Sequence, residues 1–283
     1  MTKPLRQAAT IVRELCLLAE KAGREAMRFY GGRASVVLKS DSSPLTDADR
    51  ASHDLLMLFL PDLISGVPVI SEESEAPTES SAHGADRFWL VDPLDGTKEF
   101  LKGTGEFTVN IALIENGRSI IGVVHAPVLG LTYFADLKEG AFRKNQGEAP
   151  VAIRTQRANF ERLRVVASKD HAGPLVKAML ARMPDAELKS MGSSLKFCLI
   201  AEGNADIYLR DIPTMEWDTA AAQCIVEVAG GRICTLDGNP LRYGKPGLKN
   251  PAIITVGDSD LQWPSLLDAD QLADHTAQLA HKT

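Results

Sequence analysis

The stretch Phe88-Trp89-Leu90-Val91-Asp92-Pro93-Leu94-Asp95-Gly96-Thr97 is an apolar strand that stops abruptly and presents two carboxylates three residues apart. Pro93 limits the backbone to a turn, and Gly96 lets the backbone come close to a ligand. Two acids with no basic residue between them provide the oxygen ligands that Mg²⁺ selects. If a helix begins at this turn, its free N–H groups and the Thr97 hydroxyl also suit a phosphate. A capping turn rich in aspartate explains the same residues equally well, so the motif alone leaves both interpretations open.

Three further acidic motifs lie where strands or helices are expected to begin or end. Val69-Ile70-Ser71-Glu72-Glu73 ends a strand, Trp217-Asp218-Thr219-Ala220-Ala221 opens an apolar helix, and Thr46-Asp47-Ala48-Asp49 opens another helix. These acids are typical of a solvated edge, a helix N-cap and a capping box, respectively. Taken singly, each motif is therefore explained without any function.

The first half of the chain is expected to combine two helices with a meander of strands. Apolar residues at three- and four-residue spacing predict a helix over 5–30, and a second helix is expected to begin at Thr46 and to end at Pro61. The predicted buried face of the second helix consists of Ala51, Leu55, Leu58 and Phe59. Strands are expected at 67–71, 88–91, 108–114, 120–126 and 131–135, with a turn at 115–118.

After about residue 155 the pattern changes to strands and helices in alternation, which predicts a second sheet with helices on its faces. The expected strands are 163–167, 187–191 and 206–209, and the expected helices are 175–182, 195–202 and 218–229. We therefore expect two units. Residues 1–155 would form an α+β domain whose antiparallel sheet carries most of the metal ligands, and residues 156–283 an α/β domain that supplies Asp218 and substrate contacts.

Composition excludes several classes of partner. The 283 residues have a formal net charge of -6, so the basic field that a nucleic acid polymer needs is missing. Four separated cysteines favour a reduced cytoplasmic setting. The N-terminus does not resemble a signal peptide, and no stretch approaches the ~20 apolar residues of a transmembrane segment. Peripheral contact with the cytoplasmic face of the inner membrane and a homodimer both stay open.

The four acidic motifs together, in wording and order, resemble the magnesium-dependent, lithium-sensitive phosphatase superfamily that contains inositol monophosphatases and 3'(2'),5'-bisphosphate nucleotidases. The resemblance extends over nearly the whole chain, from Lys39-Ser40-Asp41-Ser42-Ser43-Pro44-Leu45-Thr46-Asp47-Ala48-Asp49 to Trp217-Asp218-Thr219-Ala220-Ala221. Asp95-Gly96-Thr97-Lys98-Glu99-Phe100 and the segment Gly192 to Gly203 are similar to bacterial CysQ-type bisphosphate nucleotidases. The resemblance implies a layered α-β-α-β-α sandwich of the inositol monophosphatase and fructose bisphosphatase type.

The resemblance also implies two or three bound Mg²⁺ ions. Glu72, Asp92 and the Leu94 carbonyl would hold one ion, while Asp92, Asp95 and Asp218 would hold a second. Two ions ~3.5–4 Å apart can clamp the attacking and leaving oxygens of a phosphoryl group and lower the pKa of a bound water.

Three catalytic roles follow from the same resemblance. Thr97 and Glu72 would orient the attacking water, and Asp49 would help to activate it or would bind a third ion. The amides of Gly96 and Thr97 would receive the phosphate.

A nucleoside bisphosphate has a second phosphate, which needs cationic or hydroxyl partners. The candidates are Ser193, Ser194, Lys196 and Arg210, with Lys39 as a weaker candidate. Asp218, shared with the metal site, is also expected to contact the substrate. Solvated surface charge is the common alternative for Lys196 and Arg210.

Two acids weaken this choice of substrate. Glu216 would repel a phosphate if it pointed inward, and Asp211 would suit a sugar hydroxyl of an inositol phosphate.

The predicted activity is that of a phosphoric monoester hydrolase that acts on a small phosphorylated nucleotide. It would remove the 3'-phosphate from adenosine 3',5'-bisphosphate and leave adenosine monophosphate. Two alternatives stay open, an inositol monophosphatase and a relative that binds a metal or an anion without turnover. The four acids and Thr97 together argue against the second alternative, since a sensor does not need a threonine that activates water.

Overall fold

The Asp92 motif ends strand β4 (Arg87–Asp95), which lies second from the edge of a seven-stranded sheet. The structure is a computed structural model that describes residues 8–39, 44–74, 85–167 and 173–267. Strand β3 (Val69–Ser71) pairs with β4 in parallel, and all later pairs are antiparallel. The remaining strands follow in chain order: β5 (Thr108–Glu115), β6 (Arg118–Ala126), β7 (Leu131–Asp136), β8 (Gly140–Asn145) and β9 (Val151–Ala152). The predicted meander is confirmed.

The turn between β5 and β6 explains why these strands form a tight hairpin. Asn116 and Gly117 have φ values of 51° and 71°, as a type I' turn requires at both central positions. The twist of this turn matches the right-handed twist of the strands. The expected turn at 115–118 is therefore formed by the two residue types that tolerate it best.

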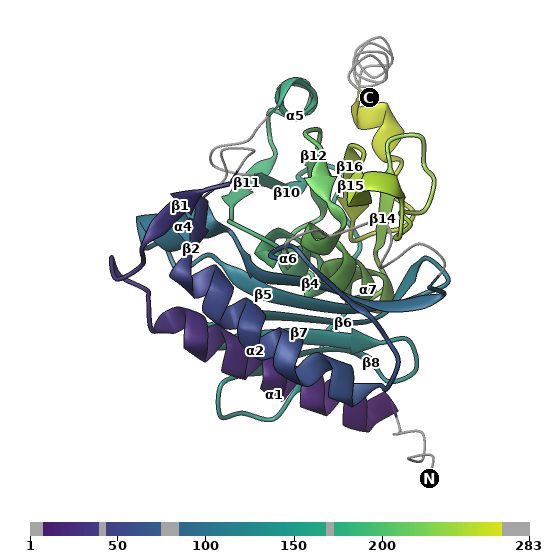
Figure 1. The fold of residues 1–283 in the computed structure, drawn as a ribbon. Helices are drawn as coiled ribbons and strands as arrows, with labels where there is room; N and C mark the ends of the chain where they lie inside the picture. The colour runs from purple at the N-terminus through teal and green to yellow at the C-terminus, as the bar shows by residue number, and fades with distance from the viewer. Residues whose placement is uncertain (1–7, 40–43, 75–84, 168–172, 268–283) are drawn as a thin grey trace.

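Helices α1 (Ala8–Met27) and α2 (Asp47–Leu63) cover one face of this sheet (Figure 1). Leu15 and Ala19 of α1 and Leu56 of α2 lie in one buried cluster with Trp89 and Val123 of the sheet. Both expected helices are confirmed within the described residues.

The predicted buried face of α2 is wrong at Leu58 and Phe59, whereas Leu55 is partly buried and packs against the core. Leu58 is 68% exposed and Phe59 is 44% exposed, whereas Leu56 and Leu60 are fully buried. The run from Leu55 to Leu60 is apolar on every side, so its spacing does not select one face. Pro61 lies inside the helix rather than at its end.

A second sheet has the strand order β11-β10-β12-β16-β14. Its strands are β10 (Arg164–Ala167), β11 (Glu187–Ser190), β12 (Ile207–Arg210), β14 (Arg232–Thr235) and β16 (Ile253–Val256). Helices α6 (Leu195–Ala201) and α7 (Ala220–Val228) lie between the two sheets, and α5 (Pro174–Ala181) covers the outer face of the second sheet (Figure 1). The predicted α-β-α-β-α sandwich is confirmed.

The remaining elements are short. They are the strands β1 (Val36–Leu38), β2 (Pro44–Thr46), β13 (Thr214–Met215) and β15 (Lys249–Asn250), the helix α4 (Thr97–Lys102), and the 3-10 turns η1 (Glu216–Asp218), η2 (Pro246–Leu248) and η3 (Trp263–Leu266). Residues 40–43 of the first family motif lie outside the described residues. The division at residue 155 stays a prediction, because α6 and α7 share one core with both sheets.

None of the helices in the described ranges combines the length and the apolar character that crossing a membrane requires.

The contact between α7 and the first sheet depends on Gly122 of β6. A Cβ atom at this position would lie 2.1 Å from the backbone oxygen of Ala221. We expect Gly122→Ala to lower the free energy of unfolding by about 2 kcal/mol or more, since such overpacking forces backbone shifts. Chemical denaturation measures this change.

Gly257→Ala is the matched control for this substitution. Gly257 is also buried, but its added Cβ would meet Ile200 at 3.4 Å, an ordinary contact distance. This variant should unfold with nearly wild-type stability. Equal stability of the two variants would show that α7 and the sheet do not approach each other closely at Gly122.

Candidate metal centre and substrate pocket

Three carboxylates from distant parts of the chain converge. Glu72, Asp92 and Asp218 each place one oxygen so that all three oxygens lie within 4.8 Å of one another. The parallel pairing of β3 with β4 sets Ser71 opposite Val91, so Glu72 and Asp92 follow side by side. Asp218 arrives from η1, in the second half of the chain. A local role at the end of a strand or the start of a helix accounts for each acid singly. It does not account for the position of all three acids at one point in the fold.

Local hydrogen bonds fix one oxygen of each aspartate. Asp92 Oδ1 accepts from the Leu94 N–H at 3.0 Å, and Asp218 Oδ2 accepts from the Met215 N–H at 2.8 Å. The second oxygen of each side chain is then available to a cation. A backbone cap and a metal ligand are thus compatible uses of one aspartate.

Burial and mutual repulsion make this cluster hard to ionise. Burial raises the pKa of Asp92 well above its ordinary value, and the charges of Glu72, Asp95 and Asp218 raise it further. The pKa of Asp218 is raised for the same reasons. Buried carboxylates of this kind gain most from a divalent cation, which accepts oxygen ligands and removes the repulsion. The donor set therefore fits Mg²⁺.

Lys39 compensates part of this negative charge. Its ammonium group lies 2.8 Å from Glu72 Oε1 and 2.7 Å from Glu73 Oε1. Burial lowers the pKa of Lys39, but the attraction of the two glutamates outweighs this effect and raises it overall. The structure places Lys39 against these acids rather than beside Lys196 and Arg210, where a second phosphate was expected.

Asp95 lies outside the group of three converging acids, and different partners hold it. The register between β4 and β5 shifts between Asp92 and Asp95, which indicates a β-bulge. Asp95 Oδ2 accepts from the Ser194 N–H at 2.6 Å and from Asn110 Nδ2 at 3.3 Å. The roles of Asp95 and of the Leu94 carbonyl as metal ligands stay predictions.

Thr97 and Asp49 form a pair beside the cluster. Gly96 adopts a left-handed conformation with φ 95° and opens the short helix α4 at Thr97. Thr97 Oγ1 donates to Asp49 Oδ1 at 3.4 Å, while Asp49 Oδ2 accepts from the Thr46 N–H at 2.7 Å. The expected capping box is therefore present, and it leaves Asp49 Oδ1 for Thr97.

A cavity of about 140 Å³ adjoins the acids. Its lining includes Asp95, Gly96, Glu99, Ser193, Ser194, Lys196, Tyr208, Arg210 and Asp218. Lys196 Nζ donates to the Ser193 carbonyl at 2.6 Å and lies 5.5 Å from the Tyr208 ring centroid. Burial lowers the pKa of Lys196 to about 8, and the nearby Arg210 lowers it as well, while the charges of Asp95 and other acids oppose the shift. The lining therefore combines acidic side chains with two basic ones, Lys196 and Arg210.

The two predicted serines differ in their contacts. Ser193 has a strained φ of 45°, and its buried hydroxyl has no hydrogen-bond partner among the described residues, a combination that is common at ligand sites. Ser194 already donates its hydroxyl to the Asp218 carbonyl at 2.8 Å. It therefore links Asp95 to Asp218, whereas Ser193 is available to a ligand.

The two acids that weakened the substrate prediction lie away from the cavity lining. Asp211 Oδ2 accepts the N–H groups of Leu175 and Val176 at 2.9 and 3.4 Å, so it caps α5 instead of facing a sugar. Glu216 is fully buried and pairs with Lys245 at 2.6 Å. Repulsion of a phosphate by Glu216 is therefore ruled out by its position.

Thr108 and Asn110 were missed by sequence reasoning. They lie on the same face of β5, and Asn110 Nδ2 donates to both Asp95 and Ser194. Two buried polar residues at alternate positions of an otherwise apolar strand were the available signal. A larger cavity of about 540 Å³ between α1 and β7–β8 contains none of the predicted site residues, so the carboxylates and not cavity size locate the site.

Comparison with known proteins agrees with this geometry. The family model of the inositol monophosphatase family matches residues 7–264. The 3'(2'),5'-bisphosphate nucleotidase CysQ of Escherichia coli strain K12 is 45% identical over 234 residues, which cover 81% of this chain and 92% of that protein. The crystal structure of CysQ from Bacteroides thetaiotaomicron has 36% identity and a TM-score of 0.77, with 91% of this chain and 99% of that chain covered. The IMPase of Thermotoga maritima shares the fold, with 24% identity, a TM-score of 0.70 and coverage of 95% and 98%. The chain therefore belongs to the inositol monophosphatase family.

Proposed function

We propose that the protein is a Mg²⁺-dependent 3'(2'),5'-bisphosphate nucleotidase that hydrolyses adenosine 3',5'-bisphosphate to adenosine monophosphate and phosphate. The observation that carries this proposal is one cavity whose lining combines Asp218, a member of the acid cluster that fits a divalent cation, with the basic side chains of Lys196 and Arg210. A substrate with two phosphates can use the bound cation and the basic side chains at once. Relatives with 45% and 36% identity that bear the name CysQ support the same substrate class.

The acids would hold the cation. Glu72, Asp92 and Asp218 would be the central ligands, with Asp95 and the Leu94 carbonyl completing the sets for two or three Mg²⁺ ions. When bound, such ions neutralise phosphate oxygens and lower the pKa of the attacking water.

Thr97 and Asp49 would orient that water and take up its proton. Because Thr97 Oγ1 donates to Asp49 Oδ1, its lone pairs are free to accept a hydrogen bond from the water. Burial raises the pKa of Asp49 above its ordinary value, although the Thr46 hydrogen bonds oppose the shift. A carboxylate with a raised pKa is the better proton acceptor near neutral pH. Glu72 would orient the water from the other side.

The second phosphate would bind beside the basic side chains of the cavity. Lys196 and Arg210 provide charge, and the Ser193 hydroxyl provides a donor that no other described residue uses. The amides of Gly96 and Thr97 would receive the phosphate that is removed.

A cytoplasmic location, peripheral membrane contact and a homodimer stay predictions.

Substrate preference is the direct test. With Mg²⁺, we expect kcat/KM for adenosine 3',5'-bisphosphate to exceed that for inositol 1-phosphate by more than about tenfold, since one charge-assisted hydrogen bond contributes roughly 1.5–3 kcal/mol. Phosphate release measures both activities, and adenosine 5'-monophosphate serves as the control that lacks the 3'-phosphate. Preference for the inositol ester would overturn the proposal.

Asp92→Asn tests the metal site. The pKa of Asp92 is raised in the folded state, so its contribution to stability is present below its ordinary pKa and is lost as the pH rises through the folded-state value. At pH 7 the metal-free variant should therefore unfold at the same temperature as wild type or higher. Activity should fall more than about 100-fold, because even partners of metal ligands are worth about 10–100-fold.

Thermal unfolding with and without Mg²⁺ completes this test. Mg²⁺ should raise the Tm of wild type and not that of Asp92→Asn. Asp62→Asn makes the same chemical change at an exposed position of α2 and should behave as wild type. Retained activity in Asp92→Asn would contradict the metal site.

Lys196 predicts a pH dependence of substrate capture. Its pKa of about 8 means that the charge is present below pH 8 and is lost above it, whereas phosphate monoesters keep their charge because their second pKa is about 6. The kcat/KM for the bisphosphate should therefore fall between pH 7 and pH 9. Lys196→Arg keeps the charge and should flatten the profile. A flat wild-type profile would argue against Lys196 as a phosphate ligand.

A further inference from the structure

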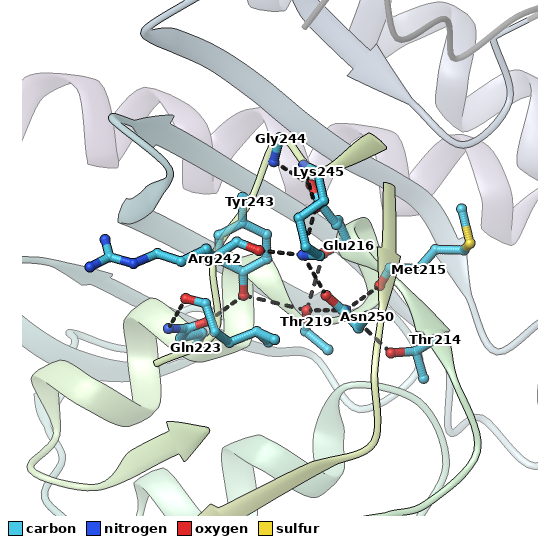
Figure 2. Close-up of polar contacts among 11 residues, drawn as sticks. Thr214, Met215, Glu216, Thr219, Gln223, Arg242, Tyr243, Gly244, Lys245 and Asn250 are labelled. Atoms are coloured by element: carbon cyan, nitrogen blue, oxygen red, sulfur yellow. Dashed lines mark hydrogen bonds and ion pairs between the residues drawn. The ribbon is translucent and has the colours of Figure 1, made fainter. Parts of the chain in front are cut away.

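A buried polar network surrounds Glu216, which precedes Asp218 by two residues in the chain (Figure 2). At its centre, the fully buried Glu216 carboxylate accepts the N–H of Gly244 at 2.7 Å and the N–H of Lys245 at 3.0 Å. The Lys245 ammonium group lies 2.6 Å from Glu216 Oε1. Glu216 therefore has three donors, and all three come from the segment after β14.

The backbone around Glu216 is fixed by a second set of bonds. Asn250 Nδ2 donates to the Met215 carbonyl at 2.8 Å and to Thr219 Oγ1 at 2.9 Å. Thr219 Oγ1 donates to the Glu216 carbonyl at 3.2 Å. The turn between Met215 and Thr219 is thus held at both of its ends by β15 and by Glu216 itself.

Asp218 needs this support because its own turn is weak. The turn η1 has only three residues, and 3-10 hydrogen bonds have poorer geometry than those of an α-helix. The Asp218 carboxylate must also stay within 4.8 Å of the Glu72 and Asp92 oxygens, against the repulsion of like charges. A rigid anchor two residues away resists that repulsion.

We propose that Glu216, clamped by Lys245 and Gly244, is a positioning residue that holds Asp218 in the metal site. This inference rests on the proposed function, because it requires that the cluster bind Mg²⁺. Under this inference Glu216 does not bind the metal itself. Its charge is neutralised by the protein, so the charge of Asp218 is left for the cation.

The test is Mg²⁺ affinity, measured by titration calorimetry on the folded protein without substrate. Glu216→Gln keeps the shape of the side chain but removes its charge. We expect its Mg²⁺ affinity to fall about 10–100-fold, as for other partners of metal ligands. At saturating Mg²⁺, kcat should recover and the substrate KM should stay near wild type.

Glu202→Gln is the matched control. Glu202 is also a largely buried glutamate, which accepts from the Tyr133 hydroxyl at 3.0 Å and lies 3.7 Å from Arg143. It supports no metal ligand. Its loss should lower the Tm and leave the Mg²⁺ affinity unchanged, which separates positioning from general stability.

Lys245→Ala keeps the inference testable if Glu216→Gln does not fold. The Lys245 side chain is 30% exposed, so its removal is better tolerated than that of buried Glu216, and the Mg²⁺ affinity should fall by several-fold. If Glu216→Gln folds and binds Mg²⁺ with wild-type affinity, the positioning role is overturned and the metal site is not. If Glu216→Gln does not fold, wild-type Mg²⁺ affinity in Lys245→Ala overturns the positioning role in the same way. A wild-type chain that binds no Mg²⁺ overturns the metal site together with it.

Discussion

The repulsion among clustered, partly buried carboxylates is the constraint on which the rest of this structure depends. Glu72, Asp92 and Asp218 lie within 4.8 Å of one another, and ionised groups at such range repel strongly when water is excluded. The chain holds them together with backbone hydrogen bonds from Leu94 and Met215. A bound divalent cation would convert this unfavourable arrangement into a favourable one, and metal binding would then be linked to stability.

Each layer of the sandwich contributes to this convergence. The parallel β3–β4 pair sets Glu72 beside Asp92, and the bulge after Asp92 directs Asp95 toward the second half of the chain. Ser194 then connects the halves, since its N–H donates to Asp95 and its hydroxyl donates to the Asp218 carbonyl. The site is therefore assembled only when both sheets and the helices between them are packed.

Sequence reasoning predicted the strands and acids with strong local patterns, and it failed where tertiary context decides. The apolar run before Asp92 predicts a strand and the capping box at Thr46 predicts a helix start, because each pattern has one local structural interpretation. The buried face of α2 could not be predicted in this way. Leu55 to Leu60 are apolar on every side of the helix, and the packing against the sheet decides which side is buried. Strands β14 and β16 were not predicted either. The segment between them is dense in glycine, proline and lysine, which are typical of loops and obscure the alternation of apolar and polar residues that indicates a strand. Asn110 has a role only because Asp95 and Ser194 meet it across the fold.

Glu216 and Asp218 show how structure divides tasks between acids that sequence cannot distinguish. They lie two residues apart in one 3-10 turn, where Glu216 is fully buried and Asp218 is half-buried. Glu216 receives two N–H groups and an ammonium group, so its charge is compensated by the protein. Asp218 receives one N–H group and faces other acids. An acid that the protein neutralises can anchor a turn, whereas an acid left among other acids is suited to a cation. The balance of donors and like charges around each oxygen therefore separates the two acids.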